Sequence, residues 1–190
     1  MEQAIVKIGF AEIIQETQRF INKHWLSVGA LSLVAAAGRF VQEGGTGRIS
    51  AEAFFTLEIA VELSRIVLVL LVIGNGAVPA GFRRIISIFR MKRTDWKQVW
   101  GQVRNNIAWN KIALSINFVL FMVIGTGVNM SIDLLTHLFL QDWLKTHGLL
   151  AATAFQWPVI LFLKNVSIIP FTLVFECVLV LILIGKVKLR

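Results

Sequence analysis

The chain of 190 residues has few charged residues for its length. They make up 16% of the sequence, whereas an average soluble domain has about 25%. Hydrophobic residues make up 56%, and a soluble domain could not hide that much apolar surface from water. The composition therefore excludes an ordinary soluble protein and predicts an integral membrane protein that folds as one compact bundle.

The residues that usually carry out chemistry are also scarce. The single cysteine, Cys177, stands inside an apolar run, so no intramolecular disulfide bond can form, and a small buried residue is the expected role. The histidines, His24, His137 and His147, all stand outside the centres of the apolar runs, which argues against a haem or metal site within the membrane. The sequence has no Gly-rich phosphate loop, no CxxC pair and no supported Ser–His–Asp grouping. We therefore expect no catalytic residue, no cofactor and no metal.

Four apolar runs are long enough, or nearly so, to cross a membrane as helices. A hydrocarbon core of about 30 Å requires about 20 helical residues. The runs cover residues 25–41, 54–82, 112–132 and 157–185. The first is short and contains Arg39 near its far end, and we expect that side chain to extend outward to the interface. The sequence thus predicts an all-α integral membrane bundle with four transmembrane helices in residues 25–190, together with amphipathic interfacial helices.

The basic residues are distributed unequally among the connecting segments. Residues 83–111 contain eight of them, opposed only by Asp95, whereas the loops 42–53 and 133–156 contain one each. The C-terminal tail adds Lys186, Lys188 and Arg190. The positive-inside rule then places residues 83–111 and both termini on the cytoplasmic side. We expect the membrane to be the cytoplasmic (inner) membrane of a bacterium.

Three connecting segments have the pattern of helices that lie on a surface, and one of them is an outer helix that follows Asp133 as its N-cap and ends near His147 and Gly148. In residues 4–24 one face is mostly apolar, which indicates a helix in the membrane interface or one packed on the bundle or on a partner. The residues that share this face are Val6, Phe10, Ile13, Thr17, Phe20 and Ile21. A second amphipathic pattern follows Thr94, with a basic opposite face. We expect this basic hairpin, residues 83–111, to bind anionic lipid headgroups through Arg83, Arg84, Arg90, Lys92, Arg93 and Lys97.

Charged residues also occur inside the predicted spans. Glu58, Glu62 and Arg65 are spaced i, i+4 and i+7 on one face of the second span, and Lys164 lies at a comparable depth in the fourth. A charge at the bilayer centre costs roughly 2.5–3.5 kcal/mol on insertion scales, so such side chains face the bundle interior or a water-filled cavity. We predict that Lys164 pairs with Glu58 or Glu62, and that Glu62 pairs with Arg65. The layer is either an ion-pair network that fixes helix register or a path for an ion or substrate.

Two further features of the spans invite an interpretation. Glu176 lies in the inner half of the fourth span, with Arg83, Arg84 and Lys111 as the nearest predicted basic groups, and we single it out for a proton-linked or partner-binding role. The stretch GNGAVPAG, residues 74–81, either interrupts the second span and lines a polar cavity or allows another helix to approach closely.

These patterns support three hypotheses for function. The first is a non-catalytic accessory or scaffold subunit of a larger membrane complex. The second is an oligomeric transporter or channel that uses the intramembrane charges. The third is a membrane-bound enzyme that acts on acidic or lipid substrates. The expected partners are membrane lipids with anionic headgroups and other membrane subunits or further copies of this chain. Nucleic acid is not expected, because the basic residues cluster beside apolar spans.

Overall fold

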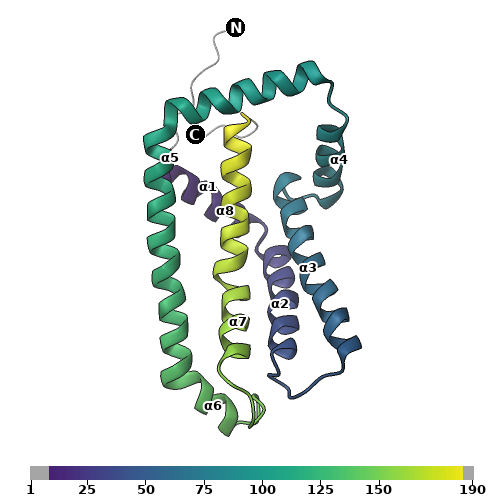
Figure 1. Ribbon diagram of the computed structural model, residues 1–190, viewed down its shortest axis with the longest axis vertical. Coiled ribbons are helices and arrows are strands. Elements are labelled where there is room, and N and C mark those ends of the chain that lie inside the picture. The colour runs from purple at the N-terminus through teal and green to yellow at the C-terminus, as the bar shows by residue number, and fades with distance from the viewer. Residues whose placement is uncertain (1–8, 186–190) are drawn as a thin grey trace. The chain divides into compact units, whose positions relative to one another are not determined.

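The computed structural model describes residues 9–185, and every regular element in that range is a helix (Figure 1). The helices are α1 (Phe10–Lys23), α2 (Trp25–Gln42), α3 (Ala51–Ile73), α4 (Val78–Phe89), α5 (Arg93–Leu135), the π-helical turn η1 (Thr136–Leu140), α6 (Gln141–Thr146), α7 (Trp157–Val166) and α8 (Ile168–Leu183). The all-α prediction is confirmed for this range. Val6 and the tail residues Lys186, Lys188 and Arg190 lie outside the described residues.

Three helical stretches are long and apolar enough to cross a membrane, judged by length and composition alone. They are Trp25–Gln42, Arg93–Thr146 and Trp157–Leu183. They correspond to three of the four predicted spans and support a membrane protein. Helix α3 is not among them, because Glu58, Glu62 and Arg65 interrupt its apolar sequence.

The second predicted span, residues 54–82, is interrupted within GNGAVPAG, which is one of the two interpretations of that stretch. Helix α3 ends at Ile73, and Asn75 (φ 53°) and Gly76 (φ 94°) then adopt left-handed backbone conformations. A left-handed residue is a common way to end a helix. Helix α4 begins at Val78 with Pro79 in its first turn, where the missing N–H group of proline costs nothing.

Small residues allow α4 to pack directly on the end of α3. A Cβ atom on Gly81 would collide with the carbonyl oxygen of Leu70, and one on Gly74 would collide with the carbonyl oxygen of Ala77. GNGAVPAG therefore both interrupts the second span and allows a close approach between helices at Gly81.

Helix α5 joins two elements that the sequence analysis kept apart. The amphipathic segment after Thr94 and the span 112–132 are one unbroken helix, Arg93–Leu135, which bends sharply after its first part (Figure 1). The Asn110 side chain donates a hydrogen bond of 2.9 Å to the carbonyl of Asn106, one turn earlier. Bonds of this kind from polar side chains often bend helices.

The fourth predicted span, residues 157–185, is also divided. Helix α7 ends at Val166 and α8 begins at Ile168. Between them Ser167 remains in the right-handed helical region but is distorted from ideal helix geometry (φ −112°, ψ −79°), and its Oγ donates to the carbonyl of Leu163 at 2.6 Å.

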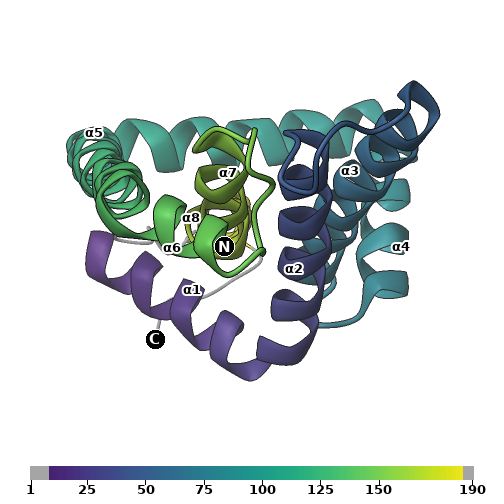
Figure 2. The same ribbon diagram turned by 90° about the horizontal axis from the view of Figure 1, so that it is seen from below.

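The chain forms two compact units, each assembled from separate segments. The described part of the first unit consists of residues 9–24, 69–123 and 172–185, and the second consists of residues 25–68 and 124–171. In the second unit α2 lies between α3 and α7, as both ribbon views show (Figures 1 and 2). The core of that unit includes Ala36, Val61 and Ile160.

In the first unit, α1 packs its apolar face on the protein itself. Ile13 and Thr17 are fully buried, and the Phe10 ring lies 6.2 Å from the Phe175 ring of α8 between centroids. Of the interpretations of this amphipathic helix, packing on the bundle is the one that the contacts support.

Candidate functional site

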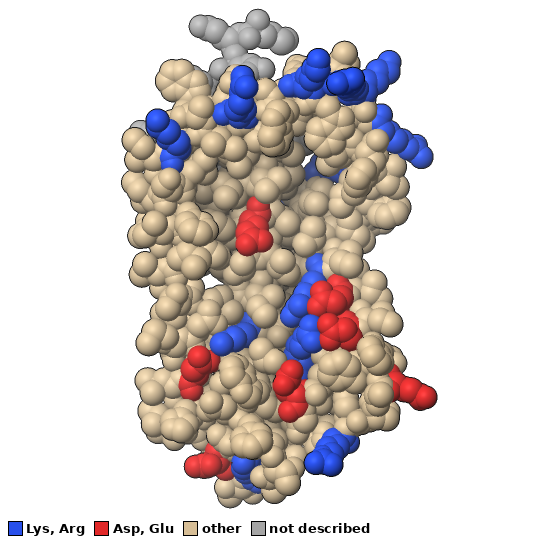
Figure 3. Space-filling model, viewed as in Figure 1, with Lys and Arg blue, Asp and Glu red and all other residues tan. Residues whose placement is uncertain are grey.

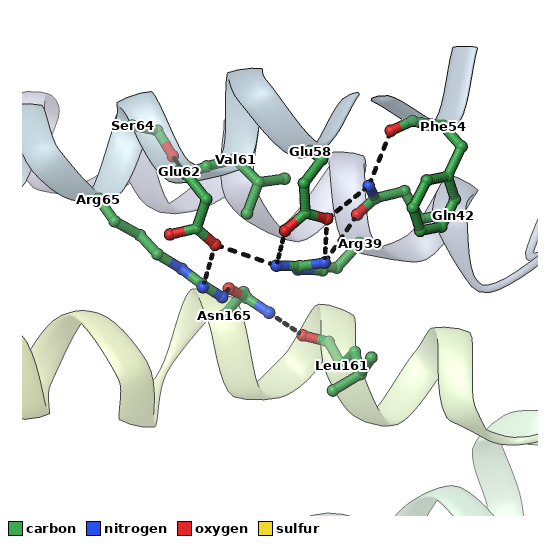
Figure 4. A network of polar contacts seen from close by, with 10 residues as sticks. All are labelled: Arg39, Gln42, Phe54, Glu58, Val61, Glu62, Ser64, Arg65, Leu161 and Asn165. Carbon is green, nitrogen blue, oxygen red and sulfur yellow. Dashed lines mark hydrogen bonds and ion pairs between the residues drawn. The ribbon is translucent and has the colours of Figure 1, made fainter. Parts of the chain in front are cut away.

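Arg39 of α2 is the centre of a polar network in the second unit (Figure 4). Its Nη1 donates to Glu58 Oε2 at 2.7 Å, and its Nη2 donates to Glu58 Oε1 at 3.0 Å. This two-pronged geometry is the strong form of an arginine–carboxylate pair. Nη2 also donates to Glu62 Oε1 at 3.0 Å. Because Glu58 and Glu62 are one helical turn apart, a single guanidinium can bind both carboxylates of α3.

A second arginine extends the network to α7. Arg65 Nη1 donates to Glu62 Oε1 at 2.7 Å, and Nη2 donates to Asn165 Oδ1 at 2.9 Å. Asn165 is 1% exposed, and its Nδ2 donates to the carbonyl of Leu161 at 2.8 Å. The network thus connects α2, α3 and α7 through polar side chains.

Gln42 closes the network at the end of α2. Its Oε1 accepts a hydrogen bond from Arg39 Nη1 at 3.1 Å. Its Nε2 donates to Glu58 Oε2 at 3.0 Å and to the carbonyl of Phe54 at 3.1 Å. Gln42 therefore orients the arginine and the carboxylate of the main ion pair together.

The charges of the network balance, and the arginines are more deeply placed than the carboxylates. The side chains of Arg39 and Arg65 are 19% and 26% exposed, whereas those of Glu58 and Glu62 are 37% and 47% exposed. Figure 3 shows acidic and basic side chains lying together within a largely uncharged surface. Among the described residues, Arg65 Nε is buried without a hydrogen-bond partner.

The structure confirms one predicted pair of this layer and corrects another. Glu62 and Arg65 are paired, as predicted. Lys164 does not contact either glutamate, because its Nζ lies 3.2 Å from Asp133 Oδ1 of α5. Successive helical residues point about 100° apart, so when Asn165 faces α3, Lys164 is turned toward a different neighbour.

Arg39 is the network residue that sequence reasoning misjudged. Its side chain was expected to extend outward to the interface, but it turns toward α3. A signal for this arrangement exists in the sequence. Because the loop between α2 and α3 is short, the last turns of α2 must lie beside the first turns of α3, where two glutamates share one face.

Glu176 is separate from this network. It is exposed on α8, and within the part of the chain that the structure describes it forms no hydrogen bond or ion pair. Of its predicted basic neighbours, Arg84 instead donates to the carbonyl of Ile73.

The basic hairpin is an exposed surface in the first unit. Its six predicted lipid-facing residues, Arg83, Arg84, Arg90, Lys92, Arg93 and Lys97, are all exposed. They lie on α4, on the short link after it and on the first turns of α5. Figure 3 shows lysine and arginine side chains gathered over this part of α5.

Among residues 9–185, no group of three or more histidine, cysteine, aspartate or glutamate side chains is placed to hold a metal ion. Comparison with protein-family models, with curated proteins and with solved structures finds no match for this chain.

Proposed function

We propose that this protein is a non-catalytic accessory or scaffold subunit of a larger complex in a bacterial inner membrane. The observation that carries the proposal is the balance of the charge network. Two arginines and two glutamates neutralise one another, and every charged group has at least one partner of opposite charge. Such an arrangement fixes α2, α3 and α7 in register and leaves no unpaired charge for a transported ion to replace.

The apolar surface of α5 supports assembly with other subunits. Ile112, Phe118 and Val123 are 70%, 67% and 63% exposed. Only 6% of the most apolar stretch of Arg93–Thr146 is buried within this chain. In a membrane this surface faces lipid or another subunit, and Glu176, exposed on α8, is a polar group that a partner can bind.

The proposal includes a fourth membrane span made by α3, with both termini on the cytoplasmic side. Pairing lowers the cost of placing the α3 charges in a membrane, because Arg39 of α2 neutralises carboxylates of α3. The basic hairpin, residues 83–111, then lies at the cytoplasmic surface and binds anionic headgroups.

A second candidate function, transport by an oligomer, is favoured by one observation. The Glu58 and Glu62 side chains remain 37% and 47% exposed, so solvent or an ion can reach them from one side. An oligomer that enclosed this face would convert the layer into a polar passage.

Native mass spectrometry of gently solubilised, tagged protein distinguishes the two functions. We expect a defined heteromeric complex containing another membrane protein in fixed stoichiometry, and no ion flux above that of empty liposomes after reconstitution of this chain alone. A homo-oligomer that carries ions in liposomes, with flux abolished by Glu62→Gln and retained by Glu52→Gln, would instead establish transport.

A further inference from the structure

A cavity of about 340 Å³ lies in the first unit, apart from the charge network. Its walls come from α1, from the end of α3 and the turn that follows, from α4 and from α8. Small-molecule sites in proteins span about 300–1,000 Å³, so this cavity can hold a compact group but not a whole lipid.

The lining of the cavity carries more positive than negative charge. Arg19 and Lys23 of α1 and Arg84 of α4 line it, together with a single carboxylate, Glu16. Arg19 pairs with Glu16, and Arg84 donates one hydrogen bond to the carbonyl of Ile73. Two of the three cations therefore have no carboxylate partner among the described residues, and this excess of positive charge suits a phosphate group.

Most of the other lining residues are apolar. They are Val72, Val178 and Leu181, which are 3%, 6% and 8% exposed, and Phe20. A free inorganic anion would leave these apolar side chains unused, and an uncharged apolar ligand would leave the cations unused. A ligand that joins a phosphate to hydrocarbon matches both kinds of lining residue.

We propose that this cavity binds the phosphate-bearing headgroup of an anionic glycerophospholipid. Arg19, Lys23 and Arg84 contact the phosphate, and the first carbons of the acyl chains lie against Val178 and Leu181. The bound lipid bridges α1, α4 and α8. This site shares Arg84 with the basic hairpin but differs from diffuse attraction of headgroups, because it also offers α1 cations and apolar contacts.

The test compares two charge-matched variants of the full-length protein in neutral detergent. Arg19→Gln/Lys23→Gln removes two cations that line the cavity, whereas Arg48→Gln/Lys145→Gln removes two cations that lie outside both the cavity and the basic hairpin. Phosphatidylglycerol, phosphatidylcholine and inorganic phosphate are titrated separately, with binding followed by thermal shift and by lipid retention in native mass spectrometry.

We expect phosphatidylglycerol to bind the wild type and the control variant similarly, and to bind the cavity variant about tenfold or more weakly, because two headgroup contacts are lost. We expect no saturable binding of phosphatidylcholine. Equal losses in the two variants would show general charge attraction and overturn the proposal. Tight binding of inorganic phosphate, at the affinity of the lipid, would overturn the lipid assignment.

A second measurement avoids the variants altogether, in case they fold poorly. Photo-crosslinking of wild-type protein with a phosphatidylglycerol that carries a photoreactive group on the glycerol side should label peptides from α1 and α8 around the cavity. Labelling confined to other helices would contradict the proposal.

Discussion

Arg39 binds two carboxylates of a neighbouring helix at once, and this makes it the residue on which the network depends. Glu62 in turn accepts from both Arg39 and Arg65. Removal of one member of such a set leaves its partners uncompensated, which destabilises a protein more than replacing a whole pair by apolar groups.

We therefore predict strong coupling between Arg39 and Glu58. Arg39→Met and Glu58→Leu should each lower the melting temperature in detergent, and the double variant should recover much of the loss, because neither charge is then left unpaired. The measurement is a double-mutant cycle by thermal unfolding.

Glu62→Gln and Lys164→Met provide the contrasting cycle, because these residues have different ion-pair partners. Their effects should simply add. Additive behaviour of Arg39 and Glu58 would show that the arginine does not hold the carboxylate in the membrane environment.

Glu176 leads to a different prediction, because it has no partner in the described chain to lose. Glu176→Gln should leave the melting temperature of the isolated protein within about 2 °C, since an exposed residue without partners contributes little to stability. Recovery of the heteromeric complex from membranes should fall several-fold. Glu16→Gln, which removes a paired carboxylate on α1, is the matched control. Unchanged recovery of the complex would remove Glu176 from the interface.

At the scale of the elements, the end of α3 and the start of α4 can approach each other closely because Gly74 and Gly81 have no side chains. The carbonyl oxygen of Leu70 occupies the space where a Cβ atom of Gly81 would stand. Backbone cannot move aside as the tip of a flexible side chain can, so this contact is sensitive to a single methyl group.

Gly81→Ala should accordingly destabilise the protein by about 1–3 kcal/mol, the usual cost of overpacking a close contact. Gly127→Ala in α5 is the control, because nothing lies within 4 Å of its added Cβ atom. That change should be neutral or stabilising by up to about 1 kcal/mol, since alanine favours helix more than glycine does. Urea or thermal unfolding in detergent measures the stability change for each variant. Equal stability changes in the two variants would mean that α4 does not pack on α3 as described.

In this protein, local sequence patterns predict contacts within a helix well, but they predict contacts between helices less well. The spacing of Glu58, Glu62 and Arg65 correctly places them on one helical face, and the Glu62–Arg65 pair follows from that spacing alone. The partner of Lys164 does not follow, because a rotation of one residue along α7 decides whether Lys164 or Asn165 faces α3. A hydropathy profile averages over a window of residues, so it does not show which of two adjacent residues faces a neighbouring helix.

The divided spans show the same limit. Hydropathy remains high through Ser167, so the run 157–185 predicts one span, and Pro170 indicates a break in its helix without placing that break at Ser167. The break after Ile73 has a clearer signal, because Asn75 and Gly76 readily adopt left-handed conformations.

At the scale of the whole molecule, the distribution of basic residues makes a prediction about topology. In a background of Cys177→Ala, single cysteines at Arg48 and Thr153 should react with a membrane-impermeant maleimide from outside intact cells. A cysteine at Thr94 should react only after permeabilisation, because the orientation that we propose from the positive-inside rule puts residues 83–111 in the cytoplasm. All three positions are exposed, and labelling of Thr94 from outside would reverse the orientation.

The discontinuous make-up of the two units has a consequence for biogenesis. The second unit requires Asn165 of α7 to complete the bonding of Arg65, and the first requires Phe175 of α8 as the neighbour of Phe10. A ribosome makes about 5–20 residues per second, so the charged face of α3 must wait for seconds after its synthesis before α7 leaves the exit tunnel. Nascent chains arrested after Gln156 should therefore be cut within α1 by added protease, whereas released full-length chains should resist, and early resistance would show that α1 docks without α8.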